Sequence, residues 1–113
     1  MSARLTSELL VTASLRRASQ LGIAAVVLRR GDPDAGSLFV EIEKSASEAA
    51  LLGRVTSFEG GYEGGYEWVR LTGAGWVAPA EVSERLAREQ ARDPDCWVIS
   101  VQDTGGRNIF DLD

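Results

Sequence analysis

The spacing of apolar and polar positions divides the chain into a helix, a run of strands, a second helix and a closing pair of strands. The first helix is predicted from apolar residues at helical spacing, namely Val11, Leu15, Ala18 and Leu21. Thr6 or Ser7 can cap its start, and Gly22 is a natural stop at its end. We expect this helix to lie on a sheet and to turn its arginines to solvent. A strand starting near residues 9–11 is the competing interpretation.

The middle of the chain carries the patterns of two to four strands. Residues 23–28 are apolar at both alternations, which suits an interior strand, and the residues 31–36 form a strong turn rich in Gly, Asp and Pro. Residues 38–43 alternate in the manner of a half-buried strand. These two strands are expected to pair as an antiparallel hairpin. Residues 49–55 predict a third, shorter strand.

Residues 58–76 are rich in glycine and aromatic side chains. The tetrapeptide Gly-Gly-Tyr-Glu occurs at residues 60–63 and again at 64–67, which is too few copies for a repeat architecture. Its four glycines predict a loop, because glycine carries a high conformational entropy cost on ordering. A strand is expected to begin or cross near Tyr66 and to end near Leu71.

The last third of the chain has the clearest pattern. A charged helix is predicted from Pro79, which suits the first helical position, to the stop at Pro94. Its expected i,i+4 ion pairs are Glu81–Arg85 and Glu84–Arg88. Residues 96–101 hold the densest run of strand formers and predict the central strand of the sheet. A turn at residues 103–106 then leads to a final strand over 108–112.

Together these elements predict a single α+β domain over residues 1–113, with a mainly antiparallel sheet and two helices packed on one face. The chain has 113 residues, of which 44% are hydrophobic and 26% charged, as is typical of a soluble globular domain. Its single cysteine, Cys96, favours a reducing compartment. No apolar run approaches the roughly 20 residues that span a bilayer, and the start lacks the features of a signal peptide. We therefore expect a cytoplasmic protein with no membrane partner.

The charge of the chain is unevenly distributed. Residues 1–31 carry five arginines and one glutamate, a charge of +4. Because the net charge of the chain is −5, the remaining residues carry a charge of −9. A net acidic chain is a poor general binder of nucleic acid, because affinity for phosphate comes from lysine and arginine. A local arginine face could still bind RNA or an acidic protein. The simpler interpretation is that the two halves of the chain pair with each other.

The composition also limits the chemistry of the chain. It has no histidine, which removes Ser-His-Asp and Cys-His catalysis and histidine-ligated zinc. Cys96 could be a nucleophile if Arg92 favoured its thiolate; otherwise it is a buried, inert strand residue. The glycine-rich stretches match no phosphate-binding motif, and the carboxylates beside Pro33 and Pro94 are explained by turns. The sequence therefore predicts no catalytic, cofactor-binding or metal-ligating residue and no cofactor.

Aromatic and arginine side chains supply the candidate interaction surface. Large aromatic residues in or near loops often mark contact surfaces, and they gather between residues 62 and 76. The candidate residues are Arg16, Arg17, Arg29, Arg30, Tyr62, Tyr66, Trp68 and Trp76. Glutamates at positions 59, 63 and 67 of the same stretch favour a protein partner over stacking with single-stranded RNA.

Several segments resemble a known family. They are Leu15-Arg16-Arg17, then Ala25-Val26-Val27 running into Arg30-Gly31-Asp32 and Ala35-Gly36, and above all Asp93-Pro94-Asp95-Cys96-Trp97-Val98. These segments resemble the small bacterial family called domain of unknown function 1491, and the resemblance covers most of the chain apart from the Gly-Gly-Tyr-Glu duplication. It implies a soluble bacterial protein of about this length and no activity, cofactor or catalytic residue.

Three functional hypotheses follow. The first is a non-enzymatic interaction domain that binds another protein or its own copy through the aromatic stretch, the arginine helix, or both. The second is a nucleic-acid-associated accessory protein, which requires the four arginines to form one patch that Asp32 and Asp34 do not neutralise. The third is a small-molecule-binding or enzymatic protein, which requires a pocket with convergent polar groups.

Overall fold

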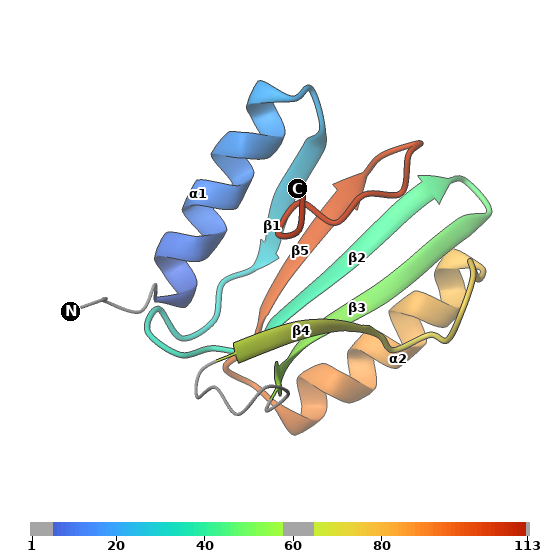
Figure 1. Cartoon of the computed structure of the whole chain (residues 1–113). Helices are drawn as coiled ribbons and strands as arrows, with labels where there is room; N and C mark the ends of the chain where they lie inside the picture. Colours follow the sequence, from blue (N-terminus) through green and yellow to red (C-terminus); the bar gives the residue numbers. More distant parts are fainter. Residues whose placement is uncertain (1–5, 58–64, 113) are drawn as a thin grey trace.

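A five-stranded sheet with one helix on each face makes up the fold of the protein (Figure 1). The computed structural model describes residues 6–57 and 65–112, so Tyr62 and the first part of the Gly-Gly-Tyr-Glu duplication lie outside the described residues. The elements are α1 (Ser7–Gln20), β1 (Ala24–Arg29), β2 (Leu38–Ser45), β3 (Glu48–Ser57), β4 (Gly65–Arg70), α2 (Pro79–Arg92) and β5 (Trp97–Gln102). The α+β class and the mainly antiparallel sheet expected from the sequence are confirmed.

The strand order, β1-β5-β2-β3-β4, differs from the predicted one, in which residues 23–28 are paired directly with residues 38–43. β5 lies between β1 and β2, antiparallel to the first and parallel to the second, so the predicted hairpin of residues 23–28 with 38–43 is wrong. The interior position of β5 and the edge position of β1 agree with the burial of their side chains. In β5, Trp97, Val98 and Ile99 are all buried, as expected for an interior strand, whereas Val26 of β1 is 57% exposed at the sheet edge.

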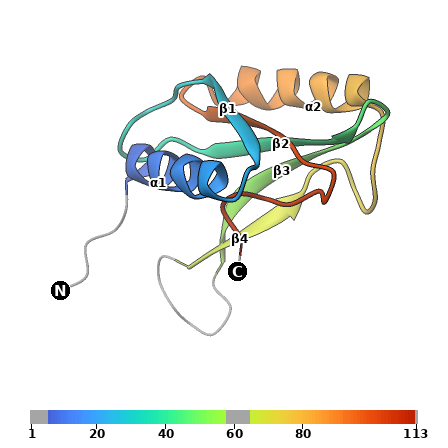
Figure 2. The same ribbon diagram turned by 90° about the horizontal axis from the view of Figure 1, so that it is seen from above.

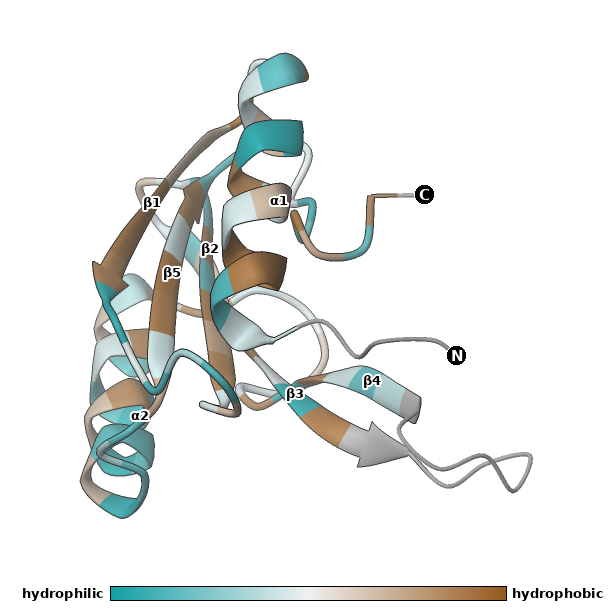
Figure 3. Cartoon of the chain, turned by 90° about the vertical axis from the view of Figure 1, so that its left-hand side faces the viewer, coloured by the Kyte–Doolittle hydropathy of each residue, from teal (hydrophilic) through white to brown (hydrophobic). Residues whose placement is uncertain are grey.

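The two helices lie on opposite faces of the sheet, which corrects the expectation that they share one face (Figures 2 and 3). Alternation along β2 sends Val40 into a core with Val11 of α1, and sends Phe39 into a second core with Val82 of α2. β5 divides in the same way, with Ile99 in the first core and its neighbour Val98 in the second. Two interior strands that are apolar on both faces need a cover on each, and one helix supplies each cover.

The last residues of the chain form turns that cross the α1 face of the sheet, and no strand is present at 108–112. The carboxylate of Asp103 accepts a hydrogen bond from the backbone N–H of Arg107 at 2.9 Å, which turns the chain just after the end of β5. Ile109 is then buried against the first core, and Phe110 packs beside it. The apolar spacing at 109–112 was therefore a signal of burial, and the strand assignment was wrong.

Both helices begin and end as the sequence predicts. The Thr6 hydroxyl accepts the N–H of Leu9, and the N–H groups of Ser7 and Glu8 donate to the carbonyls of Asp34 and Pro33. The first turn of α1 is thus capped by its own side chain and by the loop before β2, so the competing strand interpretation is wrong.

The second helix begins with Pro79 at its first turn and ends before Asp93. Its ion pairing differs from the expectation for Arg85. This side chain donates to Glu89, at 2.7 Å, and to the carbonyl of Leu71, instead of pairing with Glu81. The bond to Leu71 fixes the helix against the loop that follows β4.

Candidate functional site

The four arginines named from the sequence do not form one group. Arg29 donates to the carbonyl of Pro94, and Arg30 forms an ion pair with Glu8 and lies over the Trp97 ring, 5.1 Å from its centroid. Both side chains therefore hold together the loops at the end of β1. The carboxylate that neutralises Arg30 is Glu8, on α1.

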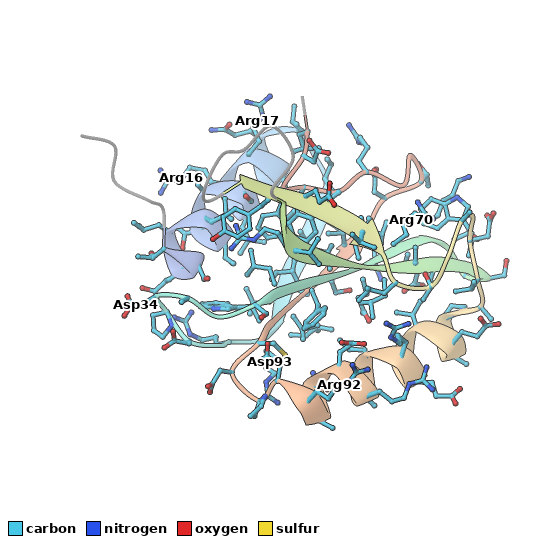
Figure 4. The ribbon with its side chains drawn as sticks, turned by 60° about the horizontal axis from the view of Figure 1, so that its bottom comes forward. Arg16, Arg17, Asp34, Arg70, Arg92 and Asp93 are labelled. Carbon is cyan, nitrogen blue, oxygen red and sulfur yellow. The ribbon has the colours of Figure 1, made fainter. Side chains whose placement is uncertain are left out.

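Arg16 and Arg17 are exposed on α1 and project away from the sheet, well apart from Arg70 (Figure 4). A groove of about 180 Å³ runs beside Arg17, between α1 and the terminal residues Ile109 and Phe110. Arg16 and Arg17 lie further along α1 than Glu8, the residue that binds Arg30, so the four arginines do not form one patch.

Strand pairing gathers the aromatic residues with cations that the sequence did not single out. In the β3–β4 register, Thr56 lies opposite Tyr66, Arg54 opposite Trp68, and Leu52 opposite Arg70. Opposite residues in antiparallel strands share a face, and Leu52 belongs to the α1-side core. The Arg54 guanidinium lies 4.0 Å from the centroid of Tyr66, which is 51% exposed.

Trp76 extends this surface towards β2. Its ring lies under two cations, with Arg70 at 4.6 Å and Lys44 at 5.4 Å from the ring centroids. Gly106 packs against the same ring, where a Cβ would lie 2.5 Å from the Cζ2 atom of Trp76. Trp68 stacks on Phe110 at 5.2 Å between ring centroids. We call the resulting surface the aromatic–basic face, and it consists of Lys44, Arg54, Tyr66, Trp68, Arg70 and Trp76.

The cations of the aromatic–basic face have no acidic partner in residues 6–57 and 65–112. The ion pairs there join Arg30, Arg85, Arg92 and Arg107 to carboxylates, but none includes Lys44, Arg54 or Arg70. Partial burial lowers the pKa of Arg54, and it remains charged at neutral pH because arginine titrates far above it. Three stacked cations can therefore still donate to carboxylate oxygens of a ligand.

Sequence reasoning found the aromatic half of this face and missed the cations. Arg54 and Arg70 lie beside the aromatic rings only because residues 52–57 pair with 65–70. No local pattern in the sequence predicts that register. Lys44 comes from a third strand, and its proximity to Trp76 depends on the course of the loop after β4.

Two of the segments that resemble the family, residues 30–36 and 93–98, meet around Trp97 in a junction of two loops. The indole N–H of Trp97 donates to the carbonyl of Asp32 at 2.8 Å, and the backbone N–H of Trp97 donates to the carbonyl of Ser37 at 2.7 Å. Gly31 and Gly36 pass so close that a Cβ on either would lie within 2.8 Å of the carbonyl oxygen of Asp95. Close packing of the two loops therefore requires glycine at positions 31 and 36.

Cys96 lies in the same junction and is fully buried. Burial raises the pKa of its thiol, and the nearby Asp93 carboxylate adds to the rise. The thiolate that a nucleophile needs is disfavoured here, so the buried-residue interpretation of Cys96 accounts for its position.

The other surface features resemble neither a ligand pocket nor a metal site. A groove of about 220 Å³ beside α2 is open and lined by charged side chains, among them Glu84 and Arg88. Within the described ranges, no three acidic, cysteine or histidine side chains converge into a possible metal site. Neither helix of that part of the chain is long and apolar enough to cross a membrane.

Comparison with known protein families identifies the family of the chain. The model of a family described as "Protein of unknown function (DUF1491)" matches residues 5–111. The chain belongs to the DUF1491 family. A search of curated proteins found no significant match.

Solved DUF1491 structures have the same fold. The NMR structure of a DUF1491 family protein from Caulobacter crescentus CB15 is 27% identical over 96% of this chain and 94% of its own, with a TM-score of 0.79. The crystal structure of a DUF1491 family protein from that organism is 26% identical over 93% and 91%, with a TM-score of 0.76. Protein Atu0922 from A. tumefaciens is 29% identical over 88% and 86%, with a TM-score of 0.70. The predicted family resemblance is confirmed.

Proposed function

We propose that this protein is a non-enzymatic interaction domain that binds an acidic segment of a partner protein on its aromatic–basic face. The observation that carries the proposal is the set of three cations, Lys44, Arg54 and Arg70, held on aromatic rings without a carboxylate partner in the described part of the chain. Arginine stacked on an aromatic ring keeps its N–H edge available, so it can donate to a carboxylate while the ring contacts apolar side chains.

The fixed positions of these side chains support binding. Arg70 donates to the carbonyl of Gly75 at 2.6 Å, and the Trp76 ring is in contact with Arg70, Lys44 and Gly106. A ligand therefore meets side chains that have already lost part of their rotamer freedom, which reduces the entropy cost of association. Aromatic residues and arginine are also the types that contribute most to protein interfaces.

A protein partner fits better than a nucleic acid. The chain carries 17 acidic and 12 basic residues, and its net charge of −5 opposes the approach of a phosphate backbone. Of the N-terminal arginines that an RNA site would need, Arg29 and Arg30 already bond to Pro94 and Glu8. A short acidic peptide segment needs only the three cations of the aromatic–basic face, which have no carboxylate partner in the described part of the chain.

The experiment uses a fluorescein-labelled octaglutamate peptide as the probe and measures its binding by fluorescence anisotropy at low salt. We expect binding that weakens as salt rises, and a loss of at least about tenfold in affinity for Arg54→Gln and for Lys44→Gln. Arg88→Gln, on the exposed side of α2, is the matched control and should bind as the wild type does.

Two results would contradict the proposal. One is equal affinity of the Arg54→Gln, Arg88→Gln and wild-type proteins for the acidic peptide. The other is tighter binding of an octauridine RNA than of the peptide, which would favour the nucleic-acid function in its place.

A further inference from the structure

The outer edge of β1 has no strand beside it in the described part of the chain. The sheet order ends at β1, whose one partner is β5. Every second residue of such an edge strand points its N–H and C=O groups away from the sheet, where another strand can bind them. Figure 3 looks onto this edge and shows that β1 is apolar over most of its length.

The β1 edge lacks most of the features that prevent strand addition. Its sequence, Ala-Ala-Val-Val-Leu-Arg, has no proline, glycine or lysine, and its only charge is on the last residue, Arg29. The Arg29 side chain donates to the carbonyl of Pro94. An irregularity in pairing between Val27 and Arg29 leaves residues 24–27 regular. The opposite edge strand, β4, instead carries Glu67 and Arg70 within its length.

The side chains next to this edge are apolar and uncovered. Val26 is 57% exposed and Leu28 56% exposed, and the core beneath α2 draws on β2, β3 and β5 without any residue of β1. Val26 borders a shallow hollow of about 140 Å³ whose other lining residues, Ala24, Ala25, Ser100 and Gln102, are all uncharged. The surface that a partner strand would meet is therefore neutral as well as apolar.

We propose that β1 pairs antiparallel with β1 of a second copy of this chain, which joins the two sheets into one of ten strands. A two-fold axis perpendicular to the sheet brings the outward N–H groups of each copy to the outward C=O groups of the other. The same axis places Val26 of each copy on the same side, so that the exposed apolar side chains cover one another.

A second copy fits this edge better than a charged partner segment does. Two identical surfaces repel each other least where they carry no net charge, and the residues around Val26 meet that condition. A segment rich in acidic or basic residues would find no complementary charge there. The β1 edge lies at the opposite end of the sheet from the aromatic–basic face, so this inference is independent of the proposed function.

The test measures the mass of the full chain by light scattering and sedimentation between about 10 µM and 1 mM, a range that brackets ordinary weak dimers. We expect the wild type to move from 12.2 kDa towards twice that mass as concentration rises. Val26→Lys should raise the dissociation constant at least about tenfold, because like charges would face each other across the axis. Leu9→Lys is the control, since Leu9 is 55% exposed on α1, and should dimerise as the wild type does.

Hydrogen exchange identifies the surface that is used. Amides of residues 24–28 should exchange more slowly at high concentration in the wild type and in Leu9→Lys, but not in Val26→Lys. A wild-type mass that stays at 12.2 kDa over the whole range would overturn the proposal. So would a dimer that Val26→Lys leaves intact, or one that forms without added protection of these amides.

Discussion

At the scale of single residues, the loop junction around Trp97 is where one added methyl group has the largest effect. A Cβ on Gly31 would lie 2.3 Å from the carbonyl oxygen of Asp95, and one on Gly36 would lie 2.7 Å from it. Backbone atoms on both sides leave little room to adjust. We expect Gly31→Ala and Gly36→Ala each to lower the free energy of unfolding by about 1–3 kcal/mol, as overpacked sites do, in urea titrations.

Gly105→Ala is the matched control for these variants. Its nearest neighbours are side-chain atoms of Asp103 and Arg107, at 3.3 Å or more, and they can move aside. A change of about 0.5 kcal/mol or less is expected there, as at ordinary surface sites. Equal losses at Gly36 and Gly105 would mean that the junction is less closely packed than its distances indicate.

The carboxylate of Asp103 gives the fold a dependence on acid pH. Its hydrogen bonds from Arg107 lower the pKa of Asp103 to about 2. Because the pKa in the folded state is below the unfolded value of about 3.9, the pair stabilises the fold above pH 4, and this contribution is lost as the pH falls through about 2. We expect the wild type to lose more stability between pH 4 and pH 2 than Asp103→Asn does, in urea titrations at each pH.

The same turn also positions Gly106 against Trp76, so the comparison requires that Asp103→Asn keeps the turn. The asparagine variant retains an oxygen that can accept the N–H of Arg107, and the fold should remain intact at pH 7. Parallel pH profiles for the two proteins would show that the ion pair contributes nothing to stability.

At the scale of elements, local patterns were sufficient for both helices and for the five strands, but not for their order. Helical spacing, Thr6 and Pro79 placed α1 and α2 correctly. Residues 96–101 form an interior strand as expected, but residues 23–28, which are apolar at both alternations, form an edge strand, because only packing decides which apolar strand is interior. The face of the sheet that each helix covers could not be predicted for the same reason.

The candidate site was predictable only in part. Aromatic residues near loops pointed to Tyr66, Trp68 and Trp76, but the cations beside them come from β2, β3 and β4, which strand pairing and the loop after β4 bring together. The sequence alone also grouped Arg16 with Arg30. In the fold, Arg30 forms an ion pair with Glu8, whereas Arg16 is exposed further along α1. Site residues that depend on long-range register therefore lie beyond the reach of local patterns.

The C-terminal segment supplies the test at this scale. Ile109 is 2% exposed and packs in the α1-side core, whereas its neighbour Asp111 is exposed. We expect Ile109→Ala to lower the free energy of unfolding by about 2–5 kcal/mol, because the segment covers the sheet as a structural element. Asp111→Ala should change it by about 0.5 kcal/mol or less. Similar small changes for both variants, measured by thermal or urea unfolding, would show that the terminal residues contribute little to the core.

At the scale of the whole molecule, one sheet separates two cores and belongs to both of them. Val11 of α1 and Val82 of α2 are each 2% exposed, on opposite faces. Neighbouring residues of β5, Val98 and Ile99, enter different cores, so neither core can be lost without disturbing the backbone that supports the other. The protein is therefore expected to unfold in a single cooperative transition.

Valine-to-alanine variants on each face test this coupling. Val11→Ala and Val82→Ala should each lower the free energy of unfolding by about 1.5–3 kcal/mol, the contribution of a buried valine side chain. In both variants the transition measured by circular dichroism, which follows the helices, should coincide with that measured by tryptophan fluorescence, to which Trp97 contributes from the α1-side core. If Val82→Ala lowered the dichroism midpoint and left the fluorescence midpoint in place, α2 would unfold separately, and the two faces would be independent layers on a shared sheet.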